Sequence, residues 1–241
     1  MVYDDVTKDY LLGNSFSNGG IIHLTKNSSD IIYRDDYLLD IARGKNILHL
    51  GFVDHIPLIN EKIEKGNWLH KKLVDVSNLC YGIDINQEGI AYIKNKYGYE
   101  NLYAVDIVSD DIPADLIDTK FDYIFIPDVI EHIGNPVDFL KVIQDRFRDN
   151  AENIILTTPN AFRWNNFENS FKRIEIINTD HRFWFSPFTL SKIVTDAGYK
   201  INNLGYFEHS KLSKIRIFKR FIINRYTPFR DTLIINASLK K

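Results

Sequence analysis

The chain has 241 residues, 44% of them hydrophobic, and carries 30 Lys and Arg against 32 Asp and Glu. This length without a Pro/Gly/Ser-rich linker predicts one domain over residues 1–241, and the near balance of charge argues against a surface that coats nucleic acid. The single cysteine, Cys80, excludes an internal disulfide, and the lack of a signal peptide or a run of about 20 apolar residues predicts a cytoplasmic protein.

Strands and helices alternate along the chain after an N-terminal helical segment over residues 1–45. Short apolar runs typical of parallel strands buried on both faces lie at 46–51, 79–84, 102–105, 121–127 and 153–158. Helical patterns separate them at 56–65 continuing toward 76, 87–97, 112–117 and 136–147, and another helix is expected over 187–197. The last two runs, 201–207 and 232–239, can form an antiparallel edge. The pattern predicts an α/β core over residues 46–207.

Two acidic residues each end one of these strands. Asp84 follows the run at 79–83, and Asp106 follows the run at 102–105. Ligands of open α/β sheets sit at the carboxyl ends of the strands, so an acid after the second strand can reach a ribose and one after the third can reach a base. The spacing therefore predicts a nucleoside pocket, although each acid could also be an ordinary turn or loop residue.

Several short motifs together carry a family resemblance. They are Ile47-Leu48-His49-Leu50-Gly51, Tyr81-Gly82-Ile83-Asp84, Ala104-Val105-Asp106, Phe121-Asp122-Tyr123-Ile124-Phe125, and the later stretches at 128–132, 157–160 and 180–183. Over about residues 46–197 this order resembles class I S-adenosylmethionine-dependent methyltransferases. The resemblance implies a Rossmann-like seven-stranded sheet, mostly parallel with the last strand antiparallel, and helices on both faces.

The same resemblance implies S-adenosyl-L-methionine as the cofactor. Its methionine end would lie over the Gly51 turn, its ribose hydroxyls at Asp84 and its adenine near Asp106 and Ile107. Arg34 precedes the first strand, where relatives often place residues near the cofactor's carboxylate. The full set of expected cofactor-binding residues is Arg34, Gly51, Phe52, Val53, His55, Asp84, Ile85, Asp106, Ile107 and Asp128.

The first turn departs from the family pattern. Relatives usually continue Leu-Gly as Cys-Gly-x-Gly, whereas here Leu50-Gly51 is followed by Phe52-Val53-Asp54-His55. Side chains at these positions do not permit the positive φ that glycine allows, so we expect a turn of another shape. The missing three-glycine fingerprint also argues against a nicotinamide-dependent enzyme. His55 either donates a hydrogen bond to the cofactor or is a solvated loop residue.

A second cluster follows the fourth strand, where Asp128, Glu131 and His132 are joined by His181 fifty residues later. If a helix begins there, the first three share one face beside the cofactor. Two carboxylates and two imidazoles could bind a divalent metal, or act without metal as acid, base or positioning groups. Asp128-x-x-Glu131 could equally be a helix capping box.

The pattern Glu-His followed by Asp-His-x-Phe is similar to that of metal-dependent small-RNA 2′-O-methyltransferases, and Glu-His recurs in ubiquinone-pathway O-methyltransferases. By this resemblance Glu131, His132 and His181 match metal-ligand positions for Mg or Mn, while Asp128 stands where a glutamate is expected. Without metal, His132 or His181 would be the general base, because an imidazole can accept a proton at neutral pH. The expected catalytic residues are His132, Glu131 and His181.

Two further segments bear on the acceptor. The loop at 159–185 is rich in aromatic and cationic residues and is a candidate acceptor lid. The stretch at 209–230 is predicted to be a basic amphipathic helical insertion without acidic residues. Such a helix could lie on the inner face of a membrane, bind polyphosphate, pack on a second subunit, or cover the sheet edge with its apolar stripe.

The sequence thus predicts an enzyme that transfers a methyl group from S-adenosylmethionine to an oxygen of a small polar acceptor. A sugar or phosphosugar of bacterial surface polysaccharide biosynthesis fits the resemblance and the cationic loop. The alternatives are a metal-dependent 2′-O-methyltransferase of RNA ends, which neither the overall charge nor a separate RNA-binding domain supports, and a catalytically silent cofactor-binding protein.

Overall fold

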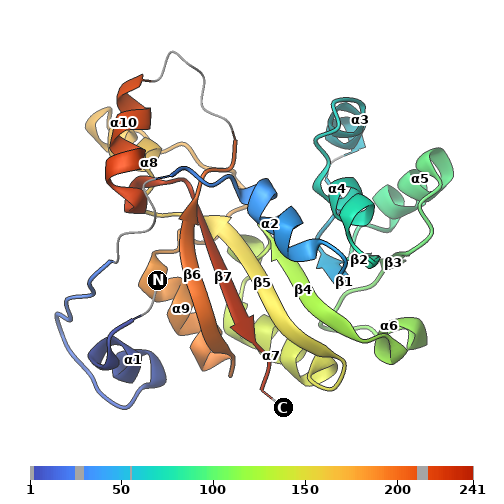
Figure 1. The fold of residues 1–241 in the computed structure, drawn as a ribbon, viewed down its shortest axis with the longest axis horizontal. Helices are drawn as coiled ribbons and strands as arrows, with labels where there is room; N and C mark the ends of the chain where they lie inside the picture. The colour runs from blue at the N-terminus through green and yellow to red at the C-terminus, as the bar shows by residue number, and fades with distance from the viewer. Residues whose placement is uncertain (1–2, 25–29, 55, 211–216, 241) are drawn as a thin grey trace.

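A seven-stranded sheet forms the centre of the molecule, in the order β3-β2-β1-β4-β5-β7-β6 (Figure 1). The computed structural model describes residues 3–24, 30–54, 56–210 and 217–240. Only β7 is reversed, since it pairs antiparallel with β5 and β6 while the other pairs are parallel. The expected α/β sheet is confirmed. Its strands are β1 (Asn46–Leu50), β2 (Leu79–Asp84), β3 (Leu102–Ala104), β4 (Phe121–Pro127), β5 (Ala151–Pro159), β6 (Lys200–Phe207) and β7 (Thr232–Ser238).

Helices lie on both faces of the sheet and above its carboxyl edge (Figure 1). Local capping explains where several begin: Ser186 and Thr189 form a capping box ahead of α9, and Asn135 caps α7, whose first residue is Pro136. The helices are α1 (Asp5–Leu12), α2 (Arg34–Ala42), α3 (Ile56–Glu64), α4 (Leu69–Val76), α5 (Gln87–Tyr97), α6 (Ala114–Asp118), α7 (Pro136–Phe147), α8 (Trp164–Phe171), α9 (Pro187–Asp196) and α10 (Ile217–Arg225), with single 3-10 turns η1 (Ile130–His132) and η2 (Thr227–Phe229).

The alternation of side chains along the strands builds two cores, one on each face. Ile47 of β1 packs with residues of α2 and α4, whereas the next residue, Leu48, packs with residues of α6, α7 and α9. Both side chains are fully buried. Because both faces of the sheet are buried, the parallel strands appear in the sequence as continuous apolar runs.

Three expectations need correction. The helix expected over 56–76 is two helices, because Gly66 has a φ of +65° shortly after the end of α3. The segment at 159–185 is not only loop, since it contains α8. The basic segment at 209–230 is described only in part, with Leu212 and Ile215 of the expected apolar stripe outside the described residues, and Phe218 and Tyr226 of that stripe are exposed instead of covering the sheet edge.

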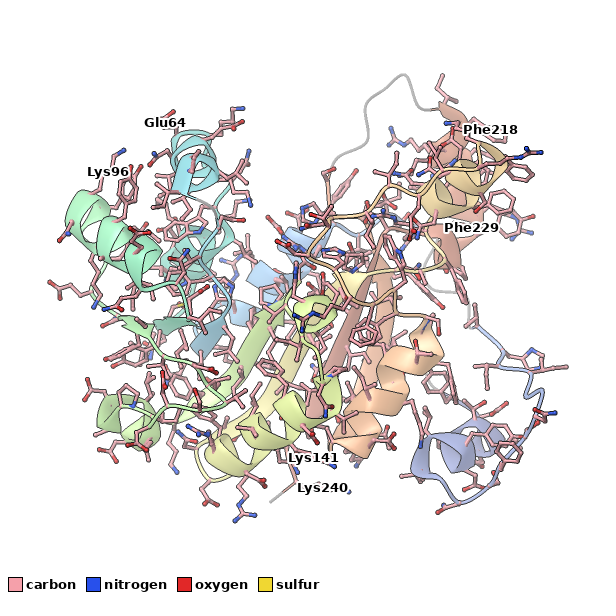
Figure 2. The ribbon with its side chains drawn as sticks, turned by 180° about the vertical axis from the view of Figure 1, so that it is seen from behind. Glu64, Lys96, Lys141, Phe218, Phe229 and Lys240 are labelled. Atoms are coloured by element: carbon pink, nitrogen blue, oxygen red, sulfur yellow. The ribbon has the colours of Figure 1, made fainter. Side chains whose placement is uncertain are left out.

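In the part of the chain that the structure covers, no helix has the length and apolar character needed to cross a membrane. Helices α8 and α10 lie side by side at one corner, beyond the ends of β6 and β7 (Figure 1). The same pairing is visible from behind, where Phe218 and Phe229 mark that corner (Figure 2).

Candidate active site

The turn after β1 is built around Gly51, which has a φ of +68°. A Cβ at this position would lie 2.3 Å from Cγ2 of Val129, a contact that cannot be tolerated. The amide of Gly51 donates to the carbonyl of Ile83 on β2 at 2.9 Å. Gly51 is therefore required both by its backbone conformation and by the close approach of the segment that follows β4.

The bulky residues after Gly51 are accommodated by glycines elsewhere. Phe52 is buried, and a Cβ on Gly82 of β2 would lie 2.8 Å from its ring. Val53 packs against Gly89 in α5, where a Cβ would lie 2.4 Å from its Cγ1. The space that Phe52 and Val53 need is thus created on the neighbouring strand and helix. His55 lies outside the described residues.

Asp84 ends β2 and faces the same turn. Its Oδ2 accepts a hydrogen bond from the amide of Val53 at 2.8 Å, and its Oδ1 accepts one from the amide of Asn86 at 3.0 Å. Burial raises the pKa of Asp84 above its ordinary value, against the opposing effect of these backbone donors. Each carboxylate oxygen has a second lone pair, so Asp84 can accept further hydrogen bonds from a ligand. Ile85 beside it is 75% exposed.

Asp106, after β3, mainly supports its own turn. Its Oδ1 accepts from the amide of Val108 at 2.9 Å and its Oδ2 from the hydroxyl of Ser109 at 3.0 Å. The bond from Val108 is the main cause that lowers the pKa of Asp106. Ile107 belongs to the hydrophobic core and is almost fully buried. The expected adenine contacts of both residues stay predictions.

Asp128 is bound by two side chains and has a strained backbone. It forms an ion pair with the buried guanidinium of Arg34, and Thr157 Oγ1 donates to its Oδ1 at 2.8 Å. Although burial opposes ionisation, the charge of Arg34 keeps the pKa of Asp128 below its ordinary value. Its φ of 54° is uncommon for a residue other than glycine. Backbone strain of this kind is typical of functional positions.

The capping-box interpretation is wrong, as is the shared helical face. Only the single turn η1 follows β4, and neither Asp128 nor Glu131 caps it with a side chain. Asp128 also falls outside the one group of potential metal ligands found among the described residues, which consists of Glu131, His132 and His181. The metal role of Asp128 stays a prediction, and in this structure its carboxylate is bound by Arg34 and Thr157.

Glu131 is fully buried and only half satisfied. Its Oε2 accepts a hydrogen bond from Thr158 Oγ1 at 2.9 Å, while its Oε1 has no hydrogen-bond partner among the described residues. Burial, with a smaller contribution from the charge of Asp128, raises the pKa of Glu131 to about 8. A buried carboxyl with a free oxygen is costly to maintain, which is typical of a functional group.

The two histidines lie against this free oxygen. His181 Nε2 is 3.9 Å from Glu131 Oε1, and the rings of His132 and His181 meet edge to face with centroids 4.6 Å apart. Potential ligand atoms of the three residues all lie within 4.8 Å of one another. Burial is the main cause that lowers the pKa of His181, so its imidazole is neutral at pH 7. The segment is held in place by the amide of Arg182, which donates to the carbonyl of Glu131 at 2.8 Å.

Sequence reasoning missed the two threonines that hold this cluster. Thr157 and Thr158 end β5 and bind Asp128 and Glu131, respectively. Their motif contributed only to the family resemblance. Polar residues that end a buried strand next to the acidic pair were the signal, because neighbouring parallel strands bring their carboxyl ends together.

The loop at 159–185 reaches the site through a cation–ring contact and an edge-to-face ring contact. The guanidinium of Arg163 lies 4.6 Å from the ring centre of Trp184, whose ring is 6.3 Å from that of His181. Asn160 ties the loop to the segment before β7, since its Nδ2 donates at 2.7 Å to the carbonyls of Pro228 and Arg230. The loop thus connects the histidines with α8 and, through η2, with α10.

Comparisons with known proteins identify the family. The methyltransferase domain family matches residues 64–204, more than half of the chain. The chain therefore belongs to this family. Comparison with curated proteins finds no match.

Solved structures share the fold at low identity. Magnesium protoporphyrin IX methyltransferase (ChlM) from Synechocystis PCC 6803 with bound SAH is 15% identical, with a TM-score of 0.52 over 86% of this chain and 82% of that one. An S-adenosylmethionine-dependent methyltransferase from Clostridium acetobutylicum ATCC 824 is 14% identical, with a TM-score of 0.53 over 88% and 94%. The small RNA methyltransferase HEN1 is 15% identical, with a TM-score of 0.57 over 90% of this chain but 27% of that one. The resemblance to class I S-adenosylmethionine-dependent methyltransferases is confirmed.

Proposed function

We propose that this methyltransferase transfers a methyl group from S-adenosylmethionine to an oxygen of a small polar acceptor. The observation that carries the proposal is the buried, half-satisfied Glu131 beside His132 and His181. This cluster lies two residues after Val129, which touches the Gly51 turn. A proton-handling group and a nucleoside-type turn are therefore neighbours, as transfer to a hydroxyl requires.

The residues of the β1 and β2 ends fit the cofactor. The Gly51 turn leaves no room for a side chain, Asp84 retains acceptor capacity for ribose hydroxyls, and Ile85 presents an exposed apolar surface to a base. Arg34, whose buried guanidinium is held by Asp35 and Asp128, is the proposed partner of the cofactor's carboxylate. When bound, S-adenosylmethionine supplies an electrophilic methyl group on a sulfonium.

The task of the protein is then to align the acceptor and to remove its proton. Alignment of reactants is worth roughly 7 to 11 kcal/mol, so no covalent nucleophile is needed. His181 is neutral at pH 7 and can accept the proton of an acceptor hydroxyl, with His132 as the other candidate base. Glu131, protonated below a pH of about 8, can orient the acceptor by donating a hydrogen bond from its free oxygen.

The same three residues could hold a divalent metal. The donor set fits, because Glu131 Oε1 and His181 Nδ1 are buried atoms without a hydrogen-bond partner among the described residues. Two imidazoles and one carboxylate suit Mn²⁺ better than Mg²⁺, which prefers oxygen ligands. A bound metal would lower the pKa of the acceptor hydroxyl.

We propose a sugar or phosphosugar of bacterial surface polysaccharide biosynthesis as the acceptor. Trp184 offers a stacking surface near His181, and Arg163 lies on that ring with a positive charge suited to phosphate. A second candidate is the 2′-hydroxyl of an RNA end, favoured by the convergence of Glu131, His132 and His181. For that acceptor, the likeness to HEN1 shows only the fold.

Two measurements test the proposal. Calorimetric titration with S-adenosylmethionine and S-adenosylhomocysteine should show micromolar binding, and absence of binding would favour the catalytically silent alternative. Labelled cofactor should then methylate nucleotide-activated sugars in preference to RNA 3′ ends. In that assay His181→Ala and Glu131→Ala should each reduce kcat by roughly 10² to 10⁴-fold. His23→Ala, which changes an exposed histidine, is the matched control.

The metal part has its own test. Activity that survives chelation, together with no binding of Mn²⁺ in calorimetry, would reject the metal hypothesis. The histidines would then be the proposed bases. If RNA ends were methylated in preference to sugars, the proposed acceptor would be wrong, but the proposed methyl transfer would still hold.

A further inference from the structure

The outward face of α8 and α10 carries large apolar side chains. Ile217, Phe218 and Phe221 of α10 are each more than 60% exposed, and Phe171 at the end of α8 is 77% exposed. The two helices lie together at one corner of the molecule (Figures 1 and 2). A contiguous group of this kind on a folded protein indicates a surface that meets an apolar environment.

The orientation of α10 is fixed by its inward face. Lys219 is buried there, with Nζ 3.8 Å from Oε2 of the buried Glu208, and Ile223 is fully buried. Surface helices usually turn their apolar side inward and their charges outward. On α10 a lysine points inward while two phenylalanines point outward, so rotation of the helix cannot hide the phenylalanines without exposing Ile223 and breaking the ion pair.

Exposed cations lie on the same two helices as this apolar group. Arg220 and Arg225 on α10, and Lys172 and Arg173 after α8, are exposed. Exposed aromatic residues with cations beside them are typical of helices that lie in the interface of an anionic bilayer.

A cavity of about 530 Å³ lies between the two helices. Arg163, Lys172 and Lys219 line it, together with Glu168, Trp164 and Asn169, which is 92% buried. The three cations outnumber the one carboxylate of the lining, and an anionic headgroup would compete with Glu168 for Lys172 and with Glu208 for Lys219. The cavity and the apolar side chains belong to the same pair of helices, since Phe218 lines the one and contributes to the other.

We propose that the α8–α10 face docks on an anionic phospholipid surface, with its phenylalanines in the acyl boundary and its cations at the phosphates. A second copy of the chain fits less well, because a two-fold contact through this face would bring its cations, Arg220 and Arg225 among them, together with those of the partner. Docking does not depend on the acceptor proposed above. It would hold α8, which is linked to His181 through Arg163 and Trp184, at the membrane surface.

Vesicle co-sedimentation tests this proposal with the full-length chain. The protein should bind mixed phosphatidylcholine–phosphatidylglycerol vesicles, and bind phosphatidylcholine vesicles much less. The double variant Phe218→Ser/Phe221→Ser should weaken binding more than about tenfold, because each phenylalanine gains free energy on burial. Arg220→Glu/Arg225→Glu should weaken it by about tenfold or more, and high salt should act in the same direction.

The matched control is Phe16→Ser. Phe16 is 88% exposed and follows α1, which lies at the other end of β6 from α10 (Figure 1), so vesicle binding should be unchanged. Circular dichroism and thermal unfolding verify that all variants fold. Equal binding to both vesicle types, or unaltered binding of the phenylalanine variant, would overturn the proposal. A dimer in sedimentation equilibrium that dissociates in that variant would assign the face to subunit contact instead.

Discussion

The two halves of the candidate active site are built in different ways. At the ends of β2 and β3, Asp84 and Asp106 take hydrogen bonds mostly from backbone amides of nearby turns. At the ends of β4 and β5, the groups come from segments that are distant in sequence. Arg34 and Asp128 are 94 residues apart, and α8 lies between Glu131 and His181 along the chain. The half at β2 and β3, called the cofactor half here, follows from the sheet itself. The half at β4 and β5, called the acceptor half although its Arg34–Asp128 pair is also proposed to meet the cofactor's carboxylate, must be assembled by tertiary packing.

The two halves also differ in strain and in satisfaction of polar atoms. The acceptor half contains Asp128 with its positive φ, the free buried oxygen of Glu131 and the unpartnered Nδ1 of His181 among the described residues. Such features persist only where the surrounding structure stabilises them, and they are typical of sites that bind a ligand. Chemistry specific to this protein is therefore expected in the acceptor half.

The largest effect is expected where the halves touch. Gly51→Ala should destabilise the protein by about 2 to 5 kcal/mol and abolish cofactor binding. The Cβ of the alanine would clash with Val129, and the backbone of the alanine would have to keep a positive φ. Urea unfolding and titration with S-adenosylhomocysteine measure both effects. Gly51→Ala/Val129→Ala removes the clash but keeps the φ penalty, so it should recover part of the stability. No recovery would mean that the halves do not touch at Gly51.

The next effect concerns Glu131, whose pKa is about 8 in the folded protein and near 4.5 when unfolded. The folded state therefore holds a proton that the unfolded state loses, and stability falls as pH rises from about 4.5 to about 8. Glu131→Gln should remove this dependence and make the metal-free protein about 3 kcal/mol more stable than the parent at pH 7. Urea unfolding between pH 5 and 8 measures it.

The control for this prediction is Glu152→Gln, which changes an exposed carboxylate on β5. Its pH dependence should match that of the parent. If Glu131→Gln also matched the parent, the carboxyl would be ionised in the folded protein, and its proposed role as a hydrogen-bond donor would be wrong.

The cofactor half was largely predictable from the sequence because its determinants are local. Apolar runs located each strand of the sheet to within about two residues, and Asp84 and Asp106 follow directly from those runs. The Gly66 interruption was missed because the apolar pattern continues across it. The α8 helix was missed although Trp164, Phe167 and Phe171 are spaced as on one helical face. In the structure Phe167 and Phe171 are exposed, and Asn169 is the buried residue of the helix.

For the acceptor half, the sequence indicated which residues belong to the site, but it did not predict how they are arranged in space. The spacing of Asp128 and Glu131 fits a helix face or a capping box equally well, and only the packing of Arg34 and Thr157 on Asp128 decides against both. That packing depends on contacts between segments distant in sequence. No local pattern contains this information.

A smaller effect, confined to the cofactor half, is expected for Asp84→Asn. The carboxylate is proposed to accept ribose hydroxyls, and charge-assisted hydrogen bonds are worth about 1.5 to 3 kcal/mol, so S-adenosylhomocysteine should bind roughly 10 to 100-fold more weakly. Calorimetry measures the change, and thermal unfolding verifies the fold. Binding within a factor of two of the parent would remove Asp84 from the cofactor site.

The smallest effect is expected for Asp106→Asn, which compares the two strand-end acids directly. Both oxygens of Asp106 already serve Val108 and Ser109, and an asparagine can still accept one of these hydrogen bonds. We expect a loss of about 1 kcal/mol in stability and less than about fivefold in S-adenosylhomocysteine affinity. A loss as large as that of Asp84→Asn would show that Asp106 contacts the cofactor directly, and would make the two acids equal partners in one pocket.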